Sequence, residues 1–309
     1  MLSLVAIAAA LSVSGPVETA VTLPTQPSPL YGTMLAPDGP TRAAALIIAG
    51  SGPTDRDGNS PVGVTGGTYR RLAEGLAVEG ITTVRYDKRG IAQSHAAGPV
   101  REEDARFADF VVDARAWAAE TVRLTGQPCV WLIGHSEGSL IALAVAENNQ
   151  TVCGVVSLAG AGRSAPVVLK EQLQSVPEPL RSQAFHALDD LASGQTTQSV
   201  PGLESLFRPS VQPYLISWFA LDPAVLAAGY GGPLFIGQGS TDLQTGLADA
   251  EALKAAQPNA TLVVWEGVNH LLKTAPADRA ANIATYADPT LPLAPGVTSD
   301  VAGFILAPR

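Results

Sequence analysis

The stretch "WLIGHSEGSLIAL", residues 131–143, places a Gly-x-Ser-x-Gly pentapeptide between two apolar runs. The run before it is typical of a buried strand, and the run after it is typical of a helix. The pentapeptide therefore predicts a sharp strand-to-helix turn that presents the hydroxyl of Ser136 at the carboxyl end of a sheet. Gly134 and Gly138 suit such a turn, because a Cβ at either position would collide with neighbouring backbone. The pattern alone arises by chance in roughly one chain in ten of this length, so the interpretation depends on the rest of the chain.

Apolar runs on both sides of this turn alternate with helical patterns. The helical patterns include 68–80 and 103–125, the second with an acidic first turn and a glycine after it. This alternation predicts an α/β fold, with a mostly parallel sheet and helices on both of its faces. The strand-like runs are "AAALIIAG" (43–50), "ITTVRYD" (81–87), "GVVSLAG" (154–160), "PLFIGQG" (233–239) and "TLVVWEG" (261–267).

The alternation stops between residues 161 and 231, where helical patterns are broken by proline and glycine. We expect this block to be a helical cap inserted into a core made of 16–160 and 232–309. Most apolar side chains of the block should pack within the cap, and the rest would suit an acyl or aromatic group of a substrate.

A catalytic serine needs a base, and the base needs an acid that orients it. In this architecture the chain order is serine, acid, histidine. Of the histidines only His270 follows the last strand, since His135 belongs to the turn itself and His186 lies in the inserted block. Asp242 ends the turn "GSTD" after the preceding strand, where it would accept the Nδ1 hydrogen of His270. An aspartate is also a common turn and helix-capping residue, which is the alternative role for this position.

The negative charge that develops on the substrate oxygen needs hydrogen-bond donors. One should be the backbone N–H of Glu137, directly after the serine. The other should come from the loop "AGSGPTDRDGNS", 49–60, where Gly50 and Gly52 bracket Ser51. We therefore expect the N–H groups of Ser51 and Glu137 to form an oxyanion hole.

In this order, "GSGPTDRDGN", "YDKRG", "GHSEG", "GSTD" and "WEGVNH" resemble the α/β-hydrolase superfamily. More narrowly, the chain is similar to bacterial, often exported, serine hydrolases that carry a helical cap, over residues 17–307. The resemblance implies a triad of Ser136, Asp242 and His270 beneath a cap formed by 161–231. Many relatives have histidine where Ala49 stands, so the oxyanion loop lacks one polar anchor of the family.

The loop also carries charged residues that could support it. Asp55 and Asp57 lie within it, and Arg89 follows the next strand in "YDKRG". We expect Arg89 to pair with Asp55, Asp57 or Glu137 and so to hold the loop, without a catalytic role of its own.

The composition limits the partners. The 309 residues carry a net charge of −9 and have no basic stripe, which argues against nucleic acid and anionic membrane surfaces. No metal-binding cluster or nucleotide loop is present in the sequence, so no cofactor and no metal are expected. Cys129 and Cys153 each precede a strand-like run and would form either a disulfide or two ordinary buried thiols.

The apolar run at residues 2–13 is too short to span a bilayer and matches the core of a signal peptide. We therefore expect residues 1–15 to be a signal peptide and the protein to be periplasmic or secreted. No basic residue precedes Arg42, so the alternatives are a frayed N-terminal segment or a wrongly assigned start, in either case of a cytoplasmic protein.

Together these features predict a cofactor-independent serine hydrolase that cleaves small-molecule carboxylic esters through an acyl-enzyme. A thioesterase would use the same triad. An aminopeptidase would also use it, but would need acidic side chains near the site to hold the substrate amine. A protein of another class, a non-catalytic binder on the hydrolase scaffold, would have no need of all three triad residues.

Overall fold

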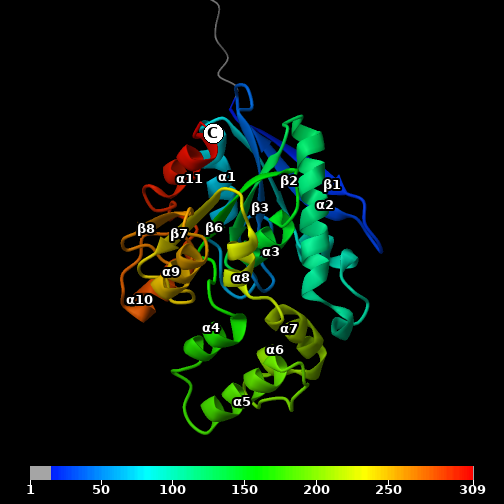
Figure 1. The fold of residues 1–309 in the computed structure, drawn as a ribbon, viewed down its shortest axis with the longest axis vertical. Coiled ribbons are helices and arrows are strands. Elements are labelled where there is room, and N and C mark those ends of the chain that lie inside the picture. The colour runs from blue at the N-terminus through cyan, green and yellow to red at the C-terminus, as the bar shows by residue number, and fades with distance from the viewer. Residues whose placement is uncertain (1–14, 309) are drawn as a thin grey trace, which may run out of the picture.

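The computed structural model describes residues 15–308. The predicted signal peptide, residues 1–15, lies outside this range except for its last residue. The described chain folds around one twisted sheet with helices on both sides, and a group of helices projects below it (Figure 1).

Within the described range eight strands form this sheet, in the order β1-β2-β4-β3-β5-β6-β7-β8. β2 pairs antiparallel with β1 and β4, and all other neighbours are parallel. The predicted mostly parallel sheet is therefore confirmed. The strands are β1 (Val17–Leu23), β2 (Leu30–Ala36), β3 (Ala43–Ile48), β4 (Ile81–Tyr86), β5 (Val130–His135), β6 (Val152–Leu158), β7 (Leu234–Gly239) and β8 (Thr261–Trp265).

The central strands are buried along their whole length, as every residue of β4, β5 and β7 shows. Helices cover both faces, which explains why these strands read as continuous apolar runs. The α-helices are α1 (Thr68–Val78), α2 (Phe107–Thr125), α3 (Glu137–Ala146), α4 (Ala165–Gln172), α5 (Leu180–Ala192), α6 (Glu204–Phe207), α7 (Gln212–Phe219), α8 (Pro223–Gly229), α9 (Leu247–Ala256), α10 (Arg279–Ala284) and α11 (Val297–Leu306). Short 3₁₀ helices are η1 (Ala92–Ala97), η2 (Glu102–Asp104), η3 (Pro209–Val211) and η4 (Thr285–Ala287).

Alternate residues of one strand serve the two faces. Leu132 of β5 joins the core formed with α2, α3, α8 and α9. Its neighbours Trp131 and Ile133 join the opposite core, formed with α1 and α11. The period of two along a strand thus divides one apolar run between two layers.

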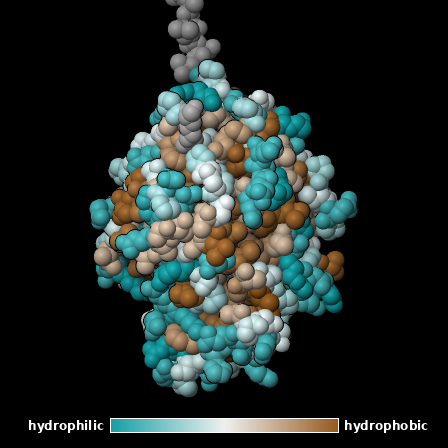
Figure 2. All heavy atoms as spheres, in the orientation of Figure 1, coloured by the Kyte–Doolittle hydropathy of each residue, from teal (hydrophilic) through white to brown (hydrophobic). Residues whose placement is uncertain are grey.

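Five helices, α4 to α8, lie between β6 and β7. Side chains of α4 to α7 form an apolar cluster of their own, whereas Ala227 of α8 packs into the main core. Figure 2 shows hydrophobic residues in the middle of the visible face, where α8 lies in Figure 1.

Cys129 and Cys153 form a disulfide between the start of β5 and β6. Of the two alternatives left open by the sequence, the structure contains the bonded pair. None of the helices within residues 15–308 is long and apolar enough to cross a bilayer.

Candidate active site

Ser136 lies at the turn between β5 and α3 and has an unusual backbone conformation, with φ 53° and ψ −122°. A residue other than glycine rarely adopts a positive φ, and such strain is typical of functional sites. The flanking glycines are required by close packing. A Cβ on Gly134 would overlap the backbone of Gly138, and a Cβ on Gly138 would overlap the carbonyl of Ile48.

Asp242 follows β7, and His270 lies in the loop after β8. The His270 Nδ1 atom lies 2.8 Å from Asp242 Oδ2, and both side chains are almost completely buried. Burial alone would raise the pKa of Asp242, but the neighbouring His270 and hydrogen bonds from His270 and from the backbone N–H groups of Gln244 and Thr245 outweigh it and lower this pKa. Asp242 is therefore a carboxylate, and a carboxylate can only accept, so His270 Nδ1 carries the hydrogen of this bond.

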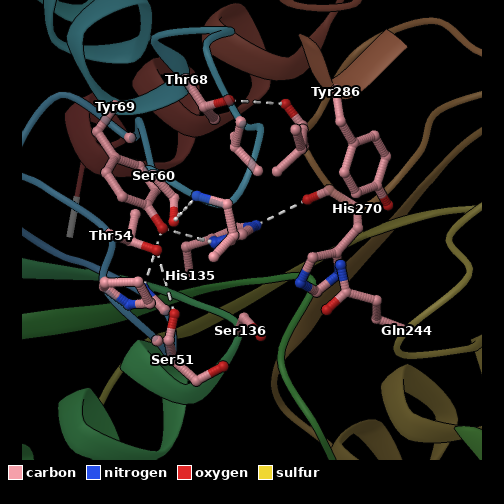
Figure 3. A pocket seen from close by; sticks show the side chains of 17 residues that line it. Ser51, Thr54, Ser60, Thr68, Tyr69, His135, Ser136, Gln244, His270 and Tyr286 are labelled. Atoms are coloured by element: carbon pink, nitrogen blue, oxygen red, sulfur yellow. Dashed lines mark hydrogen bonds between the residues drawn. The ribbon is translucent and has the colours of Figure 1, made fainter. Parts of the chain in front are cut away.

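Ser136 and His270 line the same cavity, of about 200 Å³. Figure 3 shows the two side chains facing this space from different loops. The 49–60 loop closes it from another side, since a Cβ on Gly50 would lie 3.1 Å from the Cβ of Ser136. The carboxyl ends of three parallel strands and one loop thus meet at Ser136, as open α/β sheets generally arrange their ligand sites.

The two backbone N–H groups expected to bind an oxyanion are those of Ser51 and Glu137. Within residues 15–308, neither N–H has a hydrogen-bond acceptor in the protein. Ser51 and Glu137 both line a cavity that also contains Ser136. Both donors are therefore available to a substrate oxygen near the serine.

His135 and Tyr69 connect the 49–60 loop to His270. The Gly50 N–H donates to the Tyr69 hydroxyl at 2.9 Å, and this hydroxyl lies 2.9 Å from His135 Nδ1. His135 Nε2 lies 2.7 Å from the His270 carbonyl oxygen. Because a carbonyl can only accept, Nε2 carries the hydrogen, and Nδ1 of the neutral ring accepts from Tyr69.

The burial of His135, together with the nearby His270, lowers its pKa to about 3. Burial likewise raises the pKa of Tyr69, so its hydroxyl remains a donor. The hydrogen bonds from Tyr69 to His135 and from His135 to the His270 carbonyl therefore keep these directions over the whole physiological pH range. His135 contributes two hydrogen bonds to the site and has no ring nitrogen free to act as a base.

A second network involves Lys88, which lies two residues after Tyr86, the last residue of β4. Its Nζ donates to the Gly50 carbonyl at 2.7 Å and to Glu137 Oε1 at 2.8 Å. The other carboxylate oxygen of Glu137 accepts from the hydroxyl of Tyr214 on α7, at 2.7 Å. Lys88 and Glu137 have side-chain exposures of 3% and 2%, so this ion pair is buried.

The support of the 49–60 loop differs from the prediction for Arg89. Its guanidinium makes two bonds of 2.6 Å to Asp113 on α2 and contacts none of the predicted partners. The neighbouring Lys88 takes the partner Glu137 instead, because the turn after β4 directs consecutive side chains to different neighbours. Asp55 and Asp57 do support the loop: Asp55 Oδ1 accepts the N–H groups of Asp57 and Asn59, and Asp57 pairs with Arg85 at 2.8 Å.

Sequence reasoning missed Lys88, Tyr69 and Tyr214. "YDKRG" was a usable signal for Lys88, because it places two cations at the carboxyl end of a central strand. The role of Tyr69 could not be predicted from its neighbours in the sequence, because it fits the pattern of an ordinary apolar residue of helix α1. Tyr69 and Lys88 hold the N–H and the carbonyl of Gly50, next to Ala49, whose side chain can form no hydrogen bond.

No cluster of three or more histidine, cysteine, aspartate or glutamate residues in the described part of the chain could hold a metal ion. The strained serine turn, the buried Asp–His pair and the eight-stranded sheet define an α/β-hydrolase. More particularly, residues 62–287 match the family model described as "Serine aminopeptidase, S33", and the chain belongs to this family.

Solved structures share this fold at low sequence identity. Est1E from Butyrivibrio proteoclasticus is 16% identical, with 93% of this chain and 97% of that chain covered and a TM-score of 0.60. The Pyrococcus furiosus esterase Pf2001 is 15% identical, covering 94% and 91%, with a TM-score of 0.57. A dienelactone hydrolase from Anabaena variabilis is 20% identical, covering 88% and 94%, with a TM-score of 0.52. No curated protein matches the chain.

Proposed function

We propose that the protein hydrolyses carboxylic esters through an acyl-enzyme formed on Ser136. The observation that carries this proposal is the buried Asp242–His270 pair beside a strained serine in one cavity. Ser136 Oγ attacks the carbonyl carbon while His270 Nε2 takes its proton. The N–H groups of Ser51 and Glu137 bind the oxyanion.

The tetrahedral intermediate then expels the alcohol, which takes the proton from His270. Water attacks the acyl carbon and gives a proton to His270. The second tetrahedral intermediate then breaks its bond to Ser136 Oγ, which takes the proton back from His270 as the free acid leaves. Asp242 stabilises the imidazolium in both halves and is not itself protonated.

The proton path also orients the substrate. Because His270 must reach the leaving oxygen, the alcohol occupies the cavity that His270 lines, whose wall includes Thr68 and Tyr286. The acyl group then lies on the opposite side of Ser136, beneath α4 to α7. There the serine opens on a pocket lined by Leu169 and Trp218, which continues into a larger cavity of about 650 Å³. We infer an ester of an apolar acid with a small polar alcohol.

A serine aminopeptidase is the second candidate, favoured by the description of the family. An aminopeptidase needs a carboxylate free to hold the substrate amine. The carboxylates that line the acyl cavity already have partners: Glu137 pairs with Lys88 and Glu102 pairs with Arg208. This pairing supports the ester over the aminoacyl amide.

The first experiment replaces the nucleophile. We expect Ser136→Ala to lower kcat on p-nitrophenyl butyrate by at least about 10³-fold and to abolish labelling by a fluorophosphonate probe. Ser299→Ala, an exposed serine on α11, is the matched control and should behave as the wild type. Substantial residual turnover or labelling in Ser136→Ala would overturn the mechanism.

The second experiment separates the substrate classes. Esters, thioesters and aminoacyl p-nitroanilides of matched acyl chains are compared at one enzyme concentration. We expect kcat/KM to be highest for esters and to rise with acyl length within the cavity. A preference for the aminoacyl amide would favour the aminopeptidase instead.

A further inference from the structure

We propose that Lys88 is a positioning residue that sets the direction of the oxyanion-hole peptide between Gly50 and Ser51. This inference rests on the proposed function, because it concerns the donor that the mechanism assigns to Ser51. The observation behind it is the 2.7 Å hydrogen bond from Lys88 Nζ to the Gly50 carbonyl oxygen.

The carbonyl of Gly50 and the N–H of Ser51 belong to one peptide unit. A trans peptide is planar, and its C=O and N–H bonds point in opposite directions. When Lys88 holds the carbonyl oxygen on its own side, the Ser51 N–H must point the other way. That N–H has no acceptor in the described protein and borders the cavity of Ser136.

The charge of Lys88 adds to the geometry. A hydrogen bond from an ammonium group is stronger than one from a neutral donor. It polarises the peptide further, and a polarised peptide donates more strongly through its N–H, because linked hydrogen bonds reinforce one another. The Ser51 N–H is therefore both aimed and strengthened for a developing negative charge.

The peptide is fixed from both sides. The preceding N–H, that of Gly50, is held by Tyr69. Lys88 itself is held by Glu137 Oε1 and lies over the ring of Phe110, 4.9 Å from its centroid. Glycine at position 50 would otherwise allow this peptide to rotate freely. The network replaces that freedom with one orientation.

The same lysine connects both oxyanion donors, because its partner Glu137 supplies the second N–H. Tyr214 of α7 holds the other oxygen of that carboxylate, so the helical insertion also contacts this network. Burial and the nearby Glu137 raise the pKa of Tyr214, which keeps its hydroxyl a donor. Lys88 therefore bonds to both residues that border the proposed oxyanion hole, Gly50 and Glu137, without contacting the reacting atoms.

The simpler alternative is that Lys88 only neutralises the buried Glu137. The decisive variant is the double substitution Lys88→Met with Glu137→Gln, which removes the bond to Gly50 and leaves no lone charge buried. Glu137→Gln alone is the matched control, because the glutamine oxygen can still accept from Lys88 and the bond to Gly50 remains. Lys88→Met alone reports the cost of an unpaired Glu137.

The measurements are kcat and KM on p-nitrophenyl butyrate, the Ki of an apolar trifluoromethyl ketone, and urea unfolding. Relative to Glu137→Gln, we expect the double variant to lose about 10²–10³-fold in kcat with KM within about threefold. The Ki of the ketone, whose adduct carries the oxyanion, should rise by a similar factor. A neutralising role alone would change unfolding but neither kcat nor this Ki.

The positioning role is overturned if the double variant keeps kcat within about fivefold of Glu137→Gln. It is also overturned if KM rises as much as kcat falls. The wild type reports on the proposed function separately: if it cleaves no ester and takes no fluorophosphonate label, both proposals fail together. If the wild type is active and the double variant matches its control, only the role of Lys88 fails.

Discussion

Acid should destabilise this protein through His135 before it affects the carboxylates. In the folded chain the pKa of His135 lies at about 3, because the ring is buried and close to His270. In the unfolded chain it returns to about 6.5. Between these two values the unfolded state binds a proton that the folded state does not, so stability falls as the pH falls.

The size of the effect follows from the two pKa values. The full shift corresponds to roughly 5 kcal/mol, reached only below pH 3. Between pH 7.5 and pH 5 the same relation gives a loss of about 2 kcal/mol. This window lies above the range in which Asp242 contributes, because its pKa is lowered in the fold and its contribution is lost as the pH falls through and below the unfolded value of about 3.9.

The assay compares urea unfolding at pH 7.5 and pH 5, followed by tryptophan fluorescence. His135→Gln does not titrate, and its amide N–H can still donate to the His270 carbonyl. We expect this variant to be less stable at pH 7.5 but to lose about 2 kcal/mol less than the wild type on acidification. His186→Gln, at an exposed position on α5, is the control and should show the wild-type loss. Equal losses in all three proteins would refute a buried neutral His135.

Two further predictions concern stability and the site. Replacing Cys129 and Cys153 by serine opens a link across 24 residues and should lower the free energy of unfolding by about 3 kcal/mol; an unchanged midpoint in urea would contradict a bonded pair. Tyr69→Phe leaves the Gly50 N–H and His135 Nδ1 without partners and should cost about 2–5 kcal/mol in stability. It should also lower kcat on p-nitrophenyl butyrate more than it changes KM, and a change confined to KM would argue against a role in the oxyanion loop.

The sheet could be predicted because its signals are local. Continuous apolar runs that end in glycine are typical of strands buried on both faces. The expected runs 43–50 and 233–239 contain β3 (Ala43–Ile48) and β7 (Leu234–Gly239). The serine turn could be predicted equally well. Positions 134 and 138 require glycine because a Cβ there would overlap backbone atoms a few residues away or on the neighbouring strand.

The partners of charged side chains could not be predicted in the same way. Lys88 and Arg89 are adjacent in the sequence, and both follow the same strand. One reaches Glu137 and the other reaches Asp113, 24 positions later on α2. Which cation faces which carboxylate depends on the backbone dihedral angles of the residues after β4. These angles cannot be inferred from the residue types in the sequence.

The expected site residues and the missed ones differ in how they are connected. Asp242 and His270 each follow a strand, so chain order and sheet topology suffice to suggest them. Tyr69 accepts a hydrogen bond from the Gly50 N–H, and Lys88 donates one to the Gly50 carbonyl. Every residue except proline offers both of these backbone groups, so residue types in the sequence do not indicate such partners. Because Gly50 has no side chain to fix its peptides, the groups that fix them must come from elsewhere in the fold.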